Sequence, residues 1–178
     1  MTSQDEIQLI SQKFSNSTYN STPFFSLNGK KMYCRVVNVY DGDTITVVLN
    51  IFDGFYKFSV RLNGIDTCEI KSKNEKNKEF ACFARSRLIS LITDKDTSET
   101  SLLKDRRMIN NFLNKNVYCV WIECLDFDKY GRLLANIYKN ENTSSCESFS
   151  SILLKEKLAY TYTGETKLTE EEQLDTLK

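Results

Sequence analysis

The sequence predicts an α+β fold dominated by β structure, and three observations lead to this class. The chain has 178 residues, 40% of them hydrophobic and 12% aromatic, which is enough for one substantial core and short for two domains. Five short segments are rich in β-branched and aromatic residues and are bounded by turn residues. One long amphipathic helical pattern follows the third segment. This arrangement predicts a five-stranded Greek-key barrel of the OB type with flanking helices.

The first two strands form a hairpin. A β-branched run over Lys31–Tyr40 is followed by Asp41-Gly42, a strong hairpin signal, and then by a second strand over Thr44–Leu49.

The third strand covers Tyr56–Leu62, after a turn at Asp53-Gly54, and its apolar and polar residues alternate. A period of two places Arg61 on the face that points away from the core. The residues expected on the core face are Tyr56, Phe58, Val60 and Leu62.

The remaining elements include the helix that covers the sheet. Between Asn74 and Thr93 the apolar residues recur with a period near 3.6, which is typical of an amphipathic helix. Residues 94–116 form a polar insert in which Leu102–Leu113 has the spacing of a second short helix, to which we assign no function. The later elements are a strand over Val117–Leu125, a turn at Asp128–Gly131, a fifth strand over Arg132–Tyr138 and a helix over Glu147–Ala159.

The two ends of the chain differ from its middle. Residues 1–28 are rich in Ser, Thr, Asn and Gln and predict a mobile N-terminal tail, whereas 29–165 form the barrel domain and 166–178 form a charged segment, either a surface helix or a frayed tail. No apolar run approaches the roughly 20 residues that a membrane-spanning helix needs. The first residues also lack the pattern of a secretory signal. We expect an intracellular, cytoplasmic monomer that does not bind membranes.

The composition excludes several kinds of chemistry. The sequence contains no histidine, which rules out Ser-His-Asp and Cys-His catalysis and leaves a carboxylate, or else Lys, Tyr or Cys, as proton acceptor. Lys plus Arg equals Asp plus Glu at 24 each, so nucleic acid would have to be bound by a local charge asymmetry. The six cysteines are scattered without C-x-x-C spacing and are expected to be reduced thiols.

Three polar clusters lie at the ends of predicted strands, where the loops of a barrel converge. They are Asp41-Gly42-Asp43-Thr44, Arg61 through Glu69, and Asp128-Lys129-Tyr130-Gly131-Arg132. Each cluster alone is typical of a solvated turn. Together they supply carboxylates for a hard divalent cation, a further carboxylate to activate water, and two arginines that can hold a phosphate through paired hydrogen bonds. This combination predicts metal-dependent phosphoester hydrolysis.

Over Met32–Tyr162 these residues resemble the staphylococcal nuclease (thermonuclease) family. Val39–Thr44, Val60–Glu69 and Asp128–Arg132 look like its three motifs, in the order in which the family has them. The resemblance implies a nuclease of the SNase-like, OB-fold class: an endonuclease that hydrolyses phosphodiester bonds of DNA and RNA with little base preference and leaves 3′-phosphate ends.

The same resemblance implies roles for individual residues. Asp43 and Asp66, with the backbone carbonyl of Thr67, would bind Ca²⁺, and this oxygen donor set suits Mg²⁺ or Mn²⁺ as well. Glu69 would orient or deprotonate the attacking water. The two residues that would hold the phosphate and offset its growing charge are Arg61 and Arg132.

Four further residues are implied to contact the substrate, and a fifth residue, Cys68, departs from the family pattern. Lys129 and Tyr130 are expected near the substrate phosphates. Tyr160 and Tyr162 are expected beside the base, with apolar plugs at a helix end as the alternative. Cys68 stands where the family usually has proline, so Glu69 is expected to be held less tightly and the site to be sensitive to oxidation.

Two other functions stay open. A non-catalytic module that binds nucleic acid or protein would share this fold, although such modules lose the carboxylates or arginines that this chain keeps. A Ca²⁺-regulated interaction protein would bind the metal without turnover.

Overall fold

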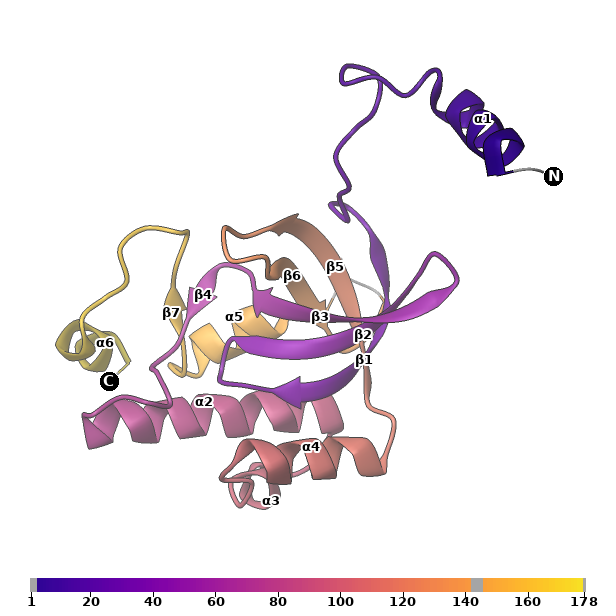
Figure 1. The fold of residues 1–178 in the computed structure, drawn as a ribbon. Helices are drawn as coiled ribbons and strands as arrows, with labels where there is room; N and C mark the ends of the chain where they lie inside the picture. The colour runs from indigo at the N-terminus through magenta and orange to yellow at the C-terminus, as the bar shows by residue number, and fades with distance from the viewer. Residues whose placement is uncertain (1–2, 142–145, 178) are drawn as a thin grey trace.

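The computed structural model describes residues 3–141 and 146–177, and within these five strands close into a barrel (Figure 1). The barrel strands are β1 (Lys31–Val39), β2 (Thr44–Ile51), β3 (Gly54–Leu62), β5 (Cys119–Phe127) and β6 (Leu133–Tyr138). Their order is β1-β2-β3-β6-β5, and β5 closes the barrel by pairing with β1. The β3–β6 pair is parallel and the others are antiparallel. The predicted OB-type barrel is confirmed.

Alternation along the strands fills the barrel with aliphatic side chains. Val60 and Leu62 are buried and point inward, as the period of two predicts. Tyr56 does not follow the prediction, since 53% of it is exposed. Its neighbour Phe55 is 78% exposed and Phe58 is only partly buried. The physical reason is that little structure packs over the tip of the β2–β3 hairpin. Side chains on both faces of the strand are therefore exposed there, whichever way they point.

Helix α2 (Glu75–Thr93) runs along one side of the barrel (Figure 1). It begins after Asn74, whose side chain accepts a hydrogen bond from the backbone N–H of Lys76. The predicted apolar stripe is buried. Leu88 and Ile92, with the partly buried Leu91, pack in the barrel core. Ala81 and the partly buried Phe80 pack instead with Cys68 and Leu177, and Ala84 is also fully buried. Arg85 of the same helix is charged, yet only 6% of it is exposed, because the insert covers it and the Lys104 carbonyl accepts its hydrogen bond at 2.9 Å.

The polar insert packs beside α2 and against the barrel. It contains α3 (Thr97–Thr100) and α4 (Arg106–Lys115), and α4 packs against β1. Ile109 and Leu113 of α4 are fully buried in the main core. The predicted second short helix is therefore present, and the structure assigns it the role of covering one face of the barrel.

The remaining elements lie at the ends of the chain and beside the site. Helix α1 (Ser3–Phe14) has no buried residues and lies at the end of an extended arm (Figure 1), whereas Leu27 already belongs to the core. The other elements are β4 (Ile65–Asp66), α5 (Phe149–Lys155), β7 (Tyr160–Thr161) and α6 (Glu170–Leu177). Leu177 of α6 packs with Cys68 and Ala81, so residues 170–177 form a helix docked on α2.

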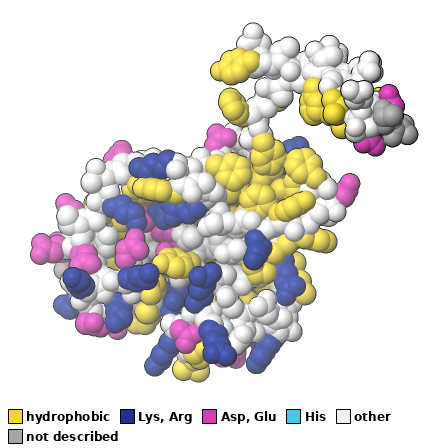
Figure 2. All heavy atoms as spheres, viewed as in Figure 1, with side chains coloured by type: hydrophobic (Ala, Val, Ile, Leu, Met, Phe, Trp, Pro, Cys, Tyr) yellow, Lys and Arg dark blue, Asp and Glu magenta, His cyan; other side chains and the backbone are white. Residues whose placement is uncertain are grey.

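The surface is mixed in character. Figure 2 shows apolar side chains gathered below the N-terminal arm and charges of both signs spread over the opposite side of the same face. Phe25, which precedes β1, contacts Phe52 in the turn between β2 and β3, with ring centroids 5.8 Å apart. Among the described helices, none combines the length and the hydropathy that crossing a bilayer requires.

The insert makes a stability prediction. Leu113→Ala removes a fully buried side chain from the main core and should lower the free energy of unfolding by about 2–5 kcal/mol. Leu102→Ala, in the same insert at 66% exposure, is the matched control and should change it by less than about 0.5 kcal/mol. Urea denaturation followed by circular dichroism measures both. Equal effects would show that α4 does not contribute to the core.

Candidate active site

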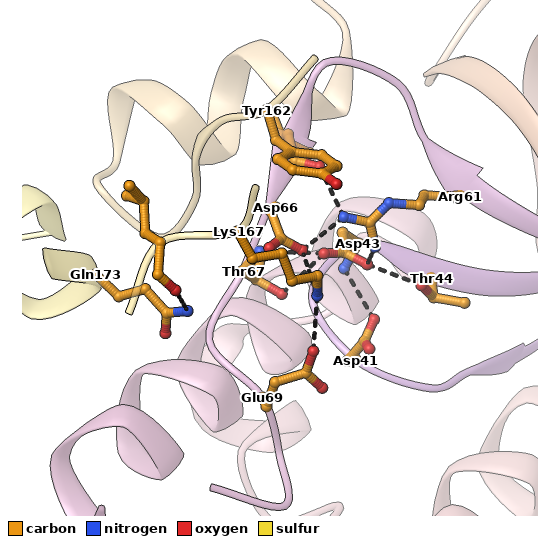
Figure 3. A network of polar contacts seen from close by, with 12 residues as sticks. Asp41, Asp43, Thr44, Arg61, Asp66, Thr67, Glu69, Tyr162, Lys167 and Gln173 are labelled. Carbon is orange, nitrogen blue, oxygen red and sulfur yellow. Dashed lines mark hydrogen bonds and ion pairs between the residues drawn. The ribbon is translucent and has the colours of Figure 1, made fainter. Parts of the chain in front are cut away.

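Arg61 lies at the centre of the site and joins two acidic side chains. It is on β3 between the inward-pointing Val60 and Leu62, so its side chain points out of the barrel interior. Its NH1 donates to Asp43 Oδ1 at 2.6 Å, and its NH2 donates to Asp66 Oδ1 at 2.5 Å (Figure 3). Only 6% of Arg61 is exposed. The guanidinium therefore fixes the two carboxylates relative to each other.

Asp43 ends the turn between β1 and β2 and is almost completely enclosed by donors. Its Oδ1 also accepts from the Thr44 hydroxyl at 2.8 Å, and its Oδ2 accepts from the N–H and hydroxyl of Thr67 at 3.1 and 3.3 Å. The backbone N–H of Asp43 donates to Asp41 Oδ1 at 3.2 Å, which closes the turn.

Gly42 allows this turn to sit close to its neighbours. A Cβ at residue 42 would lie 2.6 Å from the Ala84 Cβ on α2 and 2.9 Å from Thr67 Cγ2. Side chains do not approach this closely without something shifting. The glycine of the Asp-Gly-Asp sequence thus brings the Asp43 turn, α2 and residue 67 into contact.

Asp66 lies on β4, which pairs with β7 and so meets Tyr160. The Tyr160 hydroxyl donates to Asp66 Oδ2 at 2.5 Å, and Gln173 of α6 lies 3.4 Å from the same hydroxyl. Tyr160 is buried, so it does not face the substrate side as expected from the resemblance; it orients a carboxylate instead. The alternative, an apolar plug at a helix end, does not account for this hydrogen bond from the hydroxyl.

Glu69 and Lys167 complete the cluster on its solvent side. Lys167 Nζ lies 2.8 Å from Glu69 Oε1 and 3.2 Å from Asp66 Oδ1. The side chains of Glu69 and Lys167 are about half exposed, at 55% and 46%. Sequence reasoning missed Lys167, because a lone lysine in a polar segment 98 residues from Glu69 gives no periodic or motif signal.

The cluster contains more negative than positive charge. Four carboxylates, those of Asp41, Asp43, Asp66 and Glu69, interact with the two cations Arg61 and Lys167. Burial raises the pKa of the Asp43 carboxyl well above its ordinary value, and the neighbouring Asp41 acts in the same direction. Burial also opposes ionisation of Asp66, but hydrogen bonds from Tyr160 and Arg61 hold its pKa below the ordinary value. The buried site is short of positive charge.

A cavity of about 290 Å³ adjoins Arg61, and three basic and two aromatic side chains are among the residues that line it. Its polar and aromatic lining residues are Arg61, Asn63, Asp128, Lys129, Tyr130, Arg132, Tyr162 and Thr163. The ring of Tyr130 lies 5.2 Å from Lys129 Nζ and 5.6 Å from the Arg132 guanidinium carbon. The Arg61 guanidinium carbon lies 5.6 Å from the Tyr162 ring. Three cations and one carboxylate make this cavity suited to an anion.

The Asp128 turn positions the cationic side of the cavity. Asp128 Oδ1 accepts from the backbone N–H groups of Tyr130 and Arg132 at 2.8 and 2.9 Å, and Oδ2 accepts from Arg132 Nε at 2.7 Å. Gly131 has φ +78°, a conformation that favours glycine. The Asp-Lys-Tyr-Gly-Arg sequence is thus a turn whose first residue orients its last.

The structure groups the predicted site residues into two adjoining sets. Asp43, Arg61, Asp66, Thr67 and Glu69 belong to the acidic cluster, and Arg61 also lines the cavity with the predicted residues Lys129, Tyr130, Arg132 and Tyr162.

Cys68 is packed away from the site. Only 1% of it is exposed, and Asn77 lies 3.6 Å from its Sγ. Burial raises the pKa of this thiol, so it is a weak nucleophile. The expected sensitivity to oxidation has no support in this geometry.

The residues present fit a hard divalent cation in chemistry and in charge. The donors are carboxylate oxygens, and the excess of two negative charges matches one divalent ion. Across residues 3–141 and 146–177, however, no three acidic or cysteine side chains converge into a ready-made metal cluster. The carboxylate oxygens are therefore suitable metal ligands, but in this conformation they accept hydrogen bonds from protein groups.

Comparison with known proteins identifies the family to which this OB-type barrel belongs. Residues 107–178 match the family described as staphylococcal nuclease homologue. The uncharacterized protein MJ1439 of Methanocaldococcus jannaschii is 30% identical over 161 residues, covering 86% of this chain and 70% of that protein. The chain belongs to the staphylococcal nuclease family. This membership indicates a nuclease-type or nucleic-acid-binding function.

The two tyrosines of the site should differ in their contribution to stability. Tyr160→Phe leaves the buried Asp66 Oδ2 without the hydroxyl donor and should lower the free energy of unfolding by about 1–3 kcal/mol. Tyr162→Phe removes a hydroxyl that donates to the exposed Glu165 carbonyl and should cost less than about 0.5 kcal/mol. Guanidinium titration at pH 7 measures both. Similar costs would contradict the Tyr160–Asp66 contact.

The Asp128 turn should make stability depend on pH. Burial alone would raise the pKa of Asp128, but hydrogen bonds from Arg132 and Tyr130 hold it below the ordinary value. A carboxyl whose pKa is lower in the folded state stabilises the protein above its unfolded pKa of about 3.9, and this stabilisation is lost as pH falls through the folded pKa.

Asp128→Asn should therefore lower the free energy of unfolding by about 1–2 kcal/mol at pH 7, with the difference shrinking towards pH 2. Asp126→Asn is the control, because the exposed Asp126 accepts a long 3.4 Å bond from Ser26. Urea titrations between pH 2 and pH 7 test the prediction. A difference that does not change with pH would contradict it.

Proposed function

We propose that the protein is a divalent-cation-dependent endonuclease that hydrolyses phosphodiester bonds of DNA and RNA with low sequence specificity. The observation that carries this proposal is the position of Arg61. Its guanidinium contacts two buried carboxylates on one side and lines a cationic cavity with Arg132 on the other. A phosphodiester bound in that cavity would lie next to the acidic groups that activate water.

Arg61 and Arg132 are proposed to hold the scissile phosphate. A guanidinium has five N–H donors, and within the described residues Arg61 uses three of them, on Asp43, Asp66 and the Ile65 carbonyl. Two remain for phosphate oxygens. Charge-assisted hydrogen bonds of this kind strengthen as negative charge grows on the phosphate in the transition state.

Glu69 is proposed to orient and deprotonate the attacking water. It is the solvent-exposed carboxylate of the cluster, whereas Asp43 and Asp66 are buried and saturated with donors. A general base of this kind contributes roughly 10²–10⁴-fold to the rate. Asp43, Asp66 and the Thr67 carbonyl would hold Ca²⁺, or Mg²⁺ or Mn²⁺, and the ion supplies polarisation of the phosphate when bound.

The cavity lining supports low base specificity. Tyr130 and Tyr162 present aromatic rings, and every base can stack on such a ring. Lys129 adds a charge that attracts phosphate of any sequence. The 3′-phosphate product, the monomeric state and the cytoplasmic location remain predictions from the sequence.

One observation favours a second candidate, a nucleic-acid-binding module without catalysis. The oxygens of Asp43 and Asp66 are occupied by protein donors. If these contacts never open, the cationic cavity still binds a phosphodiester but no cation is coordinated.

Nuclease assays separate the two candidates. Purified protein incubated with plasmid DNA or single-stranded RNA should cleave both with Ca²⁺ and neither with chelator. Glu69→Gln should reduce the rate by at least about 100-fold while oligonucleotide affinity stays within about threefold. Glu123→Gln, which removes a carboxylate paired with Lys31 on the barrel wall, should leave the rate unchanged.

Two results would overturn the nuclease assignment. Oligonucleotide binding without cleavage under Ca²⁺, Mg²⁺ or Mn²⁺ would establish the binding module instead. Cleavage that persists in chelator, or in Glu69→Gln at the wild-type rate, would point to a contaminating or unrelated activity.

A further inference from the structure

Lys167 lies against the solvent side of the acidic cluster. Its Nζ contacts one oxygen each of Glu69 and Asp66, two of the carboxylates that surround the proposed cation site (Figure 3). An ammonium group in such a position neutralises part of the negative charge that a divalent cation would otherwise neutralise.

The other donors of the cluster are built into the barrel. Arg61, Thr67 and Tyr160 are 6%, 2% and 3% exposed, and each lies on or directly after a strand. Moving any of them would leave a buried carboxylate oxygen without a donor, which costs about 1–3 kcal/mol or more. Among the described donors, Lys167 is the one that approaches from solvent, with 46% of its side chain exposed.

The segment that carries Lys167 lies on the surface and is not packed into the core. Residues 163–167 are exposed and lie outside any helix or strand, between β7 and α6. Gly164 in this segment has φ +101°. Tyr162 and α6 anchor the two ends, through a hydrogen bond from Tyr162 N to the Gly64 carbonyl and through the packing of Leu177.

We propose that Lys167 is a built-in counter-ion that occupies part of the cation site, is displaced when a divalent cation binds, and thereby sets the affinity for that cation. The inference rests on the proposed function, because it requires a divalent site at Asp43 and Asp66. Binding then exchanges a singly charged ammonium on a half-exposed side chain for a doubly charged ion. The exchange also releases Glu69 Oε1 from the ammonium group, so that both oxygens of this carboxylate are free to contact water when the cation is present.

The test is Ca²⁺ binding to the full chain without substrate, measured by isothermal titration calorimetry. Lys167→Met removes the competing charge and should lower the Kd for Ca²⁺ by about tenfold. Lys31→Met is the matched control, because Lys31 is 45% exposed and pairs with Glu123 at 2.9 Å; its Kd should equal that of the wild type. Circular dichroism confirms that both variants are folded.

A second measurement uses the wild-type protein and needs no variant. Lysine acylation by acetic anhydride, quantified by mass spectrometry, should be slow at Lys167 in chelator and several times faster with saturating Ca²⁺, whereas Lys31 should not change. Simple coverage of the site by a bound ion would reduce or preserve the reactivity of Lys167, so the sign of the change distinguishes displacement from coverage.

The outcomes separate the two proposals. Ca²⁺ binding with an unchanged or raised Kd in Lys167→Met, and no rise in Lys167 acylation, would overturn the counter-ion role and leave the nuclease proposal standing. Absence of Ca²⁺, Mg²⁺ or Mn²⁺ binding to both the wild type and Lys167→Met would overturn the proposed metal-dependent function, and the inference with it.

Discussion

The buried contact of Arg61 with Asp43 and Asp66 is the interaction on which the rest of the site depends. Three charges are removed from water there, and ion pairs in such places are maintained only when their geometry and remaining hydrogen bonds compensate for desolvation. Thr44, Thr67 and Tyr160 supply those bonds. The requirement ties together the β1–β2 turn, β3, β4 and β7, so the elements that form the site also hold its charges in place.

The barrel makes this convergence possible. Its β2–β3 pairing brings Thr44 opposite Arg61, and the parallel β3–β6 pairing brings the Asp128 turn to the same end. Small residues allow the close approach that the turn at Asp43 needs, with Gly42 against Ala84 of α2. Packing of α2 against the Asp43 turn and of α6 against Tyr160 then covers the inner side of the cluster, where Asp43 and Asp66 are buried. The site is therefore shielded from solvent at Asp43 and Asp66 and open to solvent at Glu69 and Lys167.

The distribution of charge explains how a chain with no net charge presents an anion site. Positive side chains line the cavity beside Arg61, and negative side chains gather on the other side of the same guanidinium. Attraction of a polyanion is then local and is screened within about 10 Å at 0.1 M salt. Burial raises the pKa of the Asp43 carboxyl because it disfavours the charged form, and the neighbouring Asp41 adds to this rise while Arg61 opposes it. A bound cation would supply positive charge next to the same carboxylates whose ionised form burial disfavours.

Local sequence patterns determined the strands, the apolar stripe of α2 with its Asn74 cap, and the outward direction of Arg61, because these follow from periodicity and hydrogen bonding between near neighbours. The motif residues were also visible in the sequence. Tertiary structure alone decided that Tyr160 binds Asp66, that Lys167 reaches Glu69, that the insert covers Arg85, and that Tyr56 stays exposed. Each of these depends on which distant surfaces pack together, and a residue carries no local mark of a partner about a hundred positions away.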